Sequence, residues 1–112
     1  MTRSAKMIEL QAKHMEQVVH HLMSAMNQTK EYYLNTYNRI PPNVVELELF
    51  TEKVIKMVHQ IPKETTTALK FKLTKLKEKI VEFQDDYKVY VLNNLIRAYE
   101  VELIHRRSDR GN

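Results

Sequence analysis

Residues that break helices are few in this chain of 112 residues, and they cluster at two places. The single glycine is Gly111, and the three prolines are Pro41, Pro42 and Pro62. Because glycine and proline mark most tight turns, a β-rich fold of this length would need more of both. The abundant residues are Leu, Lys, Glu, Met, Gln and Arg, which lose little rotamer freedom in a helix. The sequence therefore predicts an all-α protein in three segments, about 3–39, 43–61 and 63–107.

Apolar residues in the first two segments recur at steps of three and four. In the first segment this stripe runs from Ile8 to Tyr33, and in the second from Leu47 to Ile61. With its flanking apolar neighbours, such a stripe is wide enough to face a core. Asn43 at the start of the second segment is of a type that caps a helix, so we expect the second helix to begin there.

The third segment changes its apolar face along its length. One stripe runs from Leu69 to Tyr87, and its continuation falls on Asn94 and Arg97, which are polar. A second stripe, rotated by roughly 140°, then takes over. Either the helix breaks near 84–86, which gives four helices and a closed core, or one long helix offers its second face to a partner. We favour the long helix, because no glycine or proline lies at the change.

A strand interpretation of two short windows remains open. Residues 45–49 alternate apolar and acidic side chains, and residues 69–73 alternate apolar and basic ones. Such segments would suit two paired strands of opposite charge. The helical stripes continue beyond both windows, so we prefer the helical interpretation.

The lengths of the predicted helices differ too much for a fully covered bundle. At 1.5 Å per residue they would measure about 55, 28 and 65 Å. We therefore expect an elongated antiparallel bundle, a single domain over 1–112 with a flexible basic tail at 107–112, that self-associates or joins other helical proteins. The expected partner face comprises Phe71, Val81, Val89, Leu92, Ile96, Tyr99 and Leu103.

Charge is distributed unevenly, although the net charge is only +4. Residues 63–79 are strongly basic and residues 82–102 are acidic, which favours antiparallel pairing of two copies. The alternative is a structural protein of a nucleoid or capsid that binds the phosphate backbone of nucleic acid. Its contacts would be Lys70, Lys72, Lys75, Lys77, Lys79, Arg106, Arg107 and Arg110. No motif typical of sequence-specific recognition is present.

Several kinds of chemistry lack the residues that they need. The absence of cysteine excludes disulfides, thiolate metal sites and cysteine nucleophiles, and no glycine-rich phosphate loop occurs. His14 and His21 share one helix face, and Glu102 and His105 have the spacing of di-iron bundles, which need two such motifs. We expect no catalytic residue, no metal and no cofactor.

The remaining features point to a soluble intracellular protein without a membrane partner. No apolar run is long enough to span a bilayer, and the N-terminal residues lack the apolar core of a signal peptide. Tyr32, Tyr33 and Tyr37 cluster at the end of the first segment, where a core boundary or an interface would suit them. The sequence predicts a non-enzymatic helical scaffold, adaptor or assembly subunit that acts through helix–helix contacts.

Overall fold

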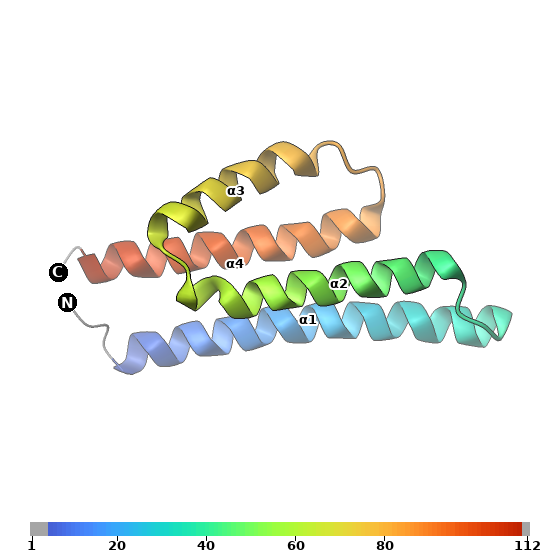
Figure 1. The fold of residues 1–112 in the computed structure, drawn as a ribbon. Coiled ribbons are helices and arrows are strands. Elements are labelled where there is room, and N and C mark those ends of the chain that lie inside the picture. Colours follow the sequence, from blue (N-terminus) through green and yellow to red (C-terminus); the bar gives the residue numbers. More distant parts are fainter. Residues whose placement is uncertain (1–4, 111–112) are drawn as a thin grey trace.

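The structure, a computed structural model, describes residues 5–110 and is helical throughout this range apart from short connections (Figure 1). Its elements are α1 (Ala5–Tyr37), α2 (Pro42–Gln60), the short 3-10 helix η1 (Ile61–Lys63), α3 (Thr66–Ile80) and α4 (Asp86–Arg110). The predicted all-α fold is confirmed. The strand interpretation is wrong, because residues 45–49 and 69–73 lie within α2 and α3.

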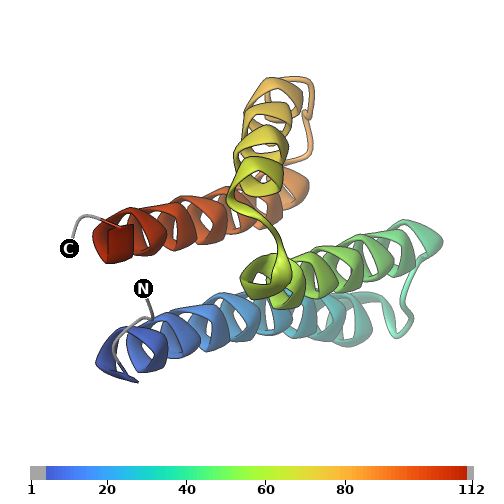
Figure 2. The ribbon, with the colours of Figure 1, turned by 60° about the vertical axis from the view of Figure 1, so that its left-hand side comes forward.

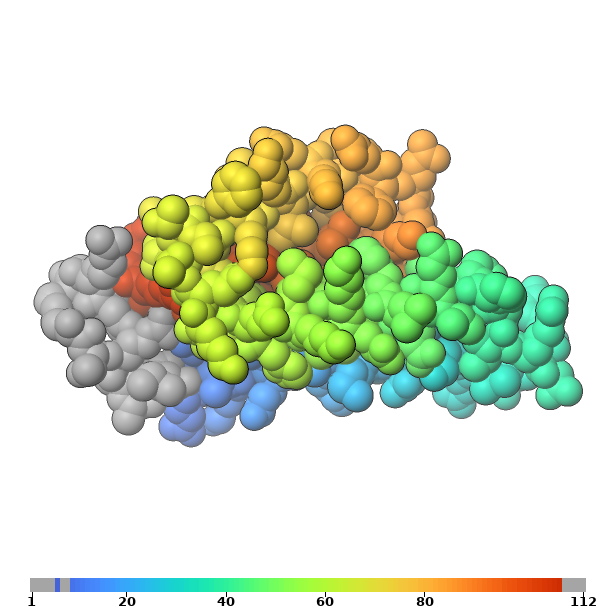
Figure 3. All heavy atoms as spheres, viewed as in Figure 1, coloured from blue at the N-terminus to red at the C-terminus, as the bar shows by residue number. Residues whose placement is uncertain are grey.

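The four helices form an elongated bundle with α4 at its centre. Helices α1 and α2 make an antiparallel hairpin, α4 packs against both of them, and α3 packs against α4 (Figures 1 and 2). The bundle measures 55 × 29 × 17 Å, which confirms the predicted elongation. The turn between α1 and α2 extends well past the beginning of α4 (Figures 1 and 3).

The long third helix that we favoured is wrong, since the chain reverses between α3 and α4. The Oδ1 atom of Asp85 accepts hydrogen bonds from the backbone N–H groups of Tyr87 (2.8 Å) and Lys88 (3.2 Å). These amides belong to the first turn of α4, where no carbonyl of the helix can reach them. A capping side chain therefore starts a new helix here without any glycine or proline.

The other helix ends also have local causes. Asn38 adopts the left-handed conformation (φ 56°) that asparagine tolerates, and its N–H closes α1 on the carbonyl of Leu34 (2.9 Å). Helix α2 begins at Pro42, one residue before the predicted cap Asn43, because the fixed φ of proline suits the first helical position. The Thr65 hydroxyl caps α3 by accepting from the N–H of Ala68 (3.1 Å).

The core forms where α4 meets the three other helices. Helix α4 contributes Val91, Leu92, Leu95, Ile96, Ala98 and Tyr99, all buried. These side chains and their neighbours pack with Met15, Val18 and Leu22 of α1, Val54 and Val58 of α2, Ile61 of η1 and Leu69 of α3. Ile8, the first residue of the predicted stripe, lies outside the side chains that the structure describes. Both stripes of the third segment thus face the interior of one chain.

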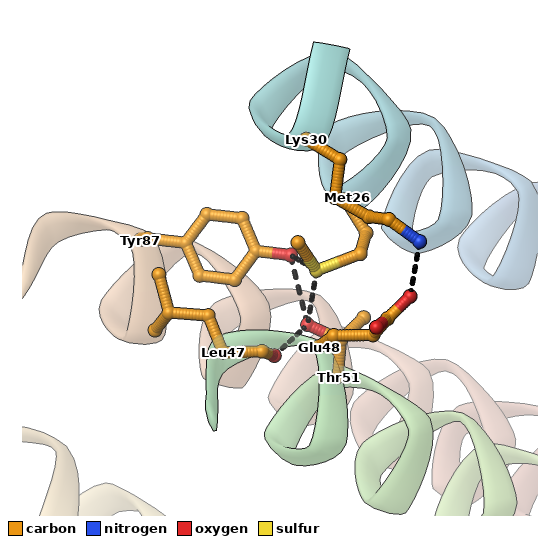
Figure 4. A network of polar contacts seen from close by, with 6 residues as sticks. All are labelled: Met26, Lys30, Leu47, Glu48, Thr51 and Tyr87. Atoms are coloured by element: carbon orange, nitrogen blue, oxygen red, sulfur yellow. Dashed lines mark hydrogen bonds and ion pairs between the residues drawn. The ribbon is translucent and has the colours of Figure 1, made fainter. Parts of the chain in front are cut away.

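A small polar network fixes the beginning of α4 on the hairpin (Figure 4). The hydroxyl oxygens of Thr51 and Tyr87 lie 2.8 Å apart, and Thr51 also donates to the carbonyl of Leu47 (2.7 Å). The Tyr87 hydroxyl lies 3.3 Å from the Met26 sulfur, so the network joins α1, α2 and α4. Burial raises the pKa of Tyr87 above its usual 10.0, which keeps the hydroxyl protonated at neutral pH.

The cap at Asp85 predicts a measurable loss of stability. We expect Asp85→Ala to lower the free energy of unfolding by about 1 kcal/mol, because it leaves two amides of α4 without an acceptor. Gln84→Ala, at an exposed neighbouring position, is the control and should change little. Urea denaturation followed by circular dichroism measures both, and equal stability of the two variants would contradict the cap.

Candidate interaction surfaces

The predicted partner face belongs mostly to the core of the chain itself. Leu92, Ile96 and Tyr99 are 5%, 8% and 0% exposed, and Val89 and Leu103 are half-buried. The prediction of a free face on these residues is therefore wrong. Its physical cause is the reversal at 81–85, which turns the second stripe of α4 inward onto the hairpin.

Two residues of the predicted face do remain exposed. Phe71 is 63% exposed and Val81 is 82% exposed, and the Lys75 ammonium lies 5.5 Å from the centre of the Phe71 ring. They are ten residues apart along α3 and its C-cap, about 15 Å. Each one is an isolated apolar side chain of the kind that ordinary protein surfaces carry.

The lysine block of α3 is partly neutralised within the chain. Lys72 forms an ion pair with Glu64, Lys77 pairs with Glu100 (3.2 Å), and Lys75 approaches Glu78 at 3.9 Å. Lys70 and Lys79 are exposed and have no ion pair within the described part of the chain. The phosphate-binding surface that the sequence predicts keeps only part of its charge free.

Arg106 is a structural residue of the bundle. Its Nε donates to Oε2 of Glu102 (2.6 Å), and its Nη1 and Nη2 donate to the Thr66 hydroxyl (3.1 Å) and the Ile61 carbonyl (3.2 Å). The Glu102 side chain is only 1% exposed, so this ion pair ties α4 to η1 and α3 in a poorly hydrated place. Arg106 is therefore not available to nucleic acid.

The described part of the predicted basic tail belongs to α4. Helix α4 continues to Arg110, so residues 107–110 are helical, and residues 111 and 112 lie outside the described part of the chain. Arg107 is exposed, and the side chain of Arg110 is not among those described. Among the described residues, no group of three His, Asp or Glu side chains is placed to hold a metal ion.

The last turns of α1 carry an exposed aromatic surface, which we call the tyrosine end and define as Tyr32, Tyr33, Leu34 and Tyr37. Ring centres lie 5.3 Å apart for Tyr32 and Tyr33 and 5.7 Å apart for Tyr33 and Tyr37. Tyr32 and Tyr37 are 57% and 58% exposed. Both tyrosines that continue the buried stripe, Tyr33 and Tyr37, lie beyond Met26, where the contact with Tyr87 marks the beginning of α4.

A groove of about 350 Å³ lies between α1 and α4. It is lined by His14, Gln17, Val18 and His21 of α1 and by Tyr90, Asn93, Asn94 and Arg97 of α4. Burial, together with the positive charges of Arg97 and His105, holds the pKa of His14 below its usual 6.5. The sequence does place His14 with His21 and Asn94 with Arg97, but only the packing of α1 on α4 brings the two pairs together.

Comparisons of the chain with protein-family models, with curated proteins and with solved structures give no match. A functional assignment must therefore come from the surfaces themselves. No helix within residues 5–110 has both the length and the apolar content that crossing a bilayer requires.

The ion pair of Arg106 predicts a strong effect on stability. Arg106→Ala should lower the free energy of unfolding by about 3 kcal/mol, because it removes the cation that contacts the buried carboxylate of Glu102 (2.6 Å). Arg107→Ala removes an exposed arginine next to it and should cost less than about 0.5 kcal/mol. Chemical denaturation distinguishes the two, and similar midpoints for both variants would show that the pair is not structural.

The lowered pKa of His14 predicts how stability depends on pH. The imidazole of His14 binds protons less well in the native state than in the unfolded chain. Its contribution to the free energy of unfolding is therefore complete above about pH 6.5. It is lost as the pH falls through the native pKa. Arg97→Gln should raise the pKa of His14, because one of the neighbouring positive charges is removed. An NMR titration of the imidazole protons measures this shift, with the exposed His20 as the internal reference.

Proposed function

We propose that this protein is a non-enzymatic helical assembly subunit that associates with a second copy of itself through the tyrosine end. The supporting observation is the exposure of this aromatic surface on a part of α1 that α4 does not reach. A soluble intracellular location belongs to the same proposal.

The mismatch in helix length leaves the tyrosine end uncovered by α4. Helix α4 begins opposite Met26, and the last three turns of α1 extend about 15 Å beyond that point. The stripe that is buried at Leu22 and Met26 continues there as Tyr33 and Tyr37. The core-facing side of α1 beyond Met26 is thus not covered by α4, and Tyr37 is left in contact with water.

Tyrosine suits a surface that is exposed in the monomer and buried in the dimer. Its ring buries a large apolar area while its hydroxyl keeps a polar partner, and tyrosine is enriched among residues that dominate binding energy. Three tyrosines and a leucine from each copy offer several hundred Å² in all, since a buried aromatic ring contributes about 150–250 Å². The expected dimer lies near the small end of specific interfaces and would be correspondingly weak.

The charges near this surface are compatible with binding of a second copy of the chain. Lys30 is already paired with Glu48 (2.5 Å), and the exposed charges around the turn are of both signs, Glu31, Arg39 and Glu46. In a two-fold dimer the same patch meets itself, so a patch of one sign would repel its copy. The mixed charges here avoid that repulsion.

The nucleic-acid alternative has less support from the described side chains. Lys72 and Lys77 are paired with acidic residues, and Arg106 is held by Glu102. Lys70, Lys79 and Arg107 remain exposed, which is a smaller set of phosphate contacts than the eight residues that the sequence suggests. We therefore keep assembly through helix contacts as the proposed function.

The proposal predicts a dimer that one charge at the tyrosine end disrupts. The wild-type protein should show a mass that rises from monomer to dimer with concentration, measured by size-exclusion chromatography with light scattering. Tyr37→Glu should remain monomeric over the same range, because two buried carboxylates would face each other across the two-fold axis. Tyr37 is 58% exposed, so the variant should retain its fold, and circular dichroism checks this.

Phe71→Glu is the matched control for this experiment. Phe71 is an aromatic residue with similar exposure, 63%, but it lies on α3 and outside the tyrosine end. It should leave the dimer unchanged. A wild-type protein that stays monomeric at every concentration, or equal disruption by Tyr37→Glu and Phe71→Glu, would overturn the proposal.

A further inference from the structure

The groove between α1 and α4 is built from two facing helix stripes with the same spacing. Positions 14, 17, 18 and 21 of α1 oppose positions 90, 93, 94 and 97 of α4. Six of the eight lining side chains are histidine, glutamine, asparagine or arginine, each of which can donate a hydrogen bond. Polar side chains that line both walls of one groove in this way indicate a surface for a polar ligand.

The charge of this groove is positive and is not balanced locally. Arg97 is exposed and has no ion pair with any described residue, and no acidic residue lines the groove. The nearest acidic residue in the adjoining hollow, Glu16, is accompanied there by Lys13. Glu100, three residues after Arg97 on α4, is paired with Lys77 (3.2 Å). An anion in the groove would therefore meet donors and no competing carboxylate.

Two buried imidazole nitrogens lie without partners near the inner wall. The Nε2 atom of His14 and the Nδ1 atom of His105 are buried and have no hydrogen-bond partner within the described part of the chain. His14 and Arg97 both line the groove, whereas His105 lies about two turns further along α4. Buried polar atoms are almost always paired in folded proteins, and unpaired ones often mark a site for a ligand.

The groove is larger than a bare ion requires. A volume of about 350 Å³ is at the lower end of small-molecule sites and is several times that of one phosphate group. Tyr90, which is 44% exposed, and Val18 give the groove an apolar part on which a ring can rest. The amides of Gln17 and Asn93 lie beside this part and could bind polar groups at the edge of such a ring.

We propose that this groove binds a small phosphate ester of nucleotide size. The guanidinium of Arg97 and the imidazoles of His14 and His21 are the groups that would hold the phosphate, because all three line the groove and can donate to its terminal oxygens. The ring of the ligand lies against Tyr90. The site is independent of the proposed dimer, since His21 is about three helical turns away from Tyr33 along α1.

NMR titrations of the whole chain test this site with three probes: inorganic phosphate, adenosine and adenosine monophosphate. Adenosine monophosphate should cause saturable shifts confined to the imidazoles of His14 and His21 and the side-chain amides of Gln17, Asn93 and Asn94. It should bind more tightly than phosphate or adenosine alone. The dimer is measured separately by light scattering, so that failure of one proposal is distinguishable from failure of the other.

Two arginine variants on the same helix make the test specific. Arg97→Gln should weaken the binding of adenosine monophosphate by about tenfold to a hundredfold, the loss expected for a charge-assisted hydrogen bond. Arg107→Gln removes an exposed arginine of α4 that does not line the groove, and it should leave the affinity unchanged. Both residues are exposed, so both variants should keep the wild-type fold.

Three outcomes would overturn the proposal. The first is the absence of saturable shifts with adenosine monophosphate. The second is an equal loss of affinity in Arg97→Gln and Arg107→Gln, which would show attraction by net charge only. The third is tighter binding of a single-stranded oligonucleotide without terminal phosphate that depends on Lys70 and Lys79, which would assign the phosphate contacts to nucleic acid on α3.

Discussion

The reversal of the chain between α3 and α4 is the constraint on which the rest of the structure depends. The carboxylate of Asp85 starts α4 by accepting from the amides of Tyr87 and Lys88. Because the chain turns back here, α4 can place one side against α3 and the other against the hairpin. Without the turn, the second stripe would point away from the molecule and would need a partner to cover it.

Contacts near both ends of α4 hold it in this central position. Near its beginning, the Tyr87 hydroxyl lies beside Thr51 and Met26, which connects α4 to both helices of the hairpin (Figure 4). Toward its other end, Arg106 joins Glu102 to Ile61 and Thr66. The second contact buries an ion pair. The three directed hydrogen bonds of Arg106 fix the position of α4 relative to η1 and α3 in this poorly hydrated region.

Two surfaces of opposite chemistry result from the way α1 exceeds α4 in length. Where α4 runs beside α1, a groove with histidine, amide and arginine side chains forms between them. Beyond Met26, where α4 is absent, the core-facing stripe of α1 continues into water as aromatic rings. One helix thus carries a polar surface that suits a small anion and an apolar surface that suits another helix.

The helical class and most helix ends can be predicted from the sequence, because these depend on neighbouring residues. The Pro41–Pro42 pair separates α1 from α2, Pro62 lies in η1, and steps of three and four identify the core side of α1 and α2. The sequence also placed a possible break near 84–86 and a tyrosine cluster at the end of α1. It could not decide between a capped turn and a continuous helix, since Asp85 and Asp86 are compatible with both.

Which apolar residues are covered, and which polar residues of different helices come together, depends on how the helices pack. Leu92, Ile96 and Tyr99 are buried because α1, α2 and η1 close over them, and these contacts join residues far apart in the chain. The proximity of His14 on α1 to Arg97 on α4 has the same origin. Periodicity shows that a residue faces some neighbour, whereas the direction of the chain after each turn determines which neighbour it is.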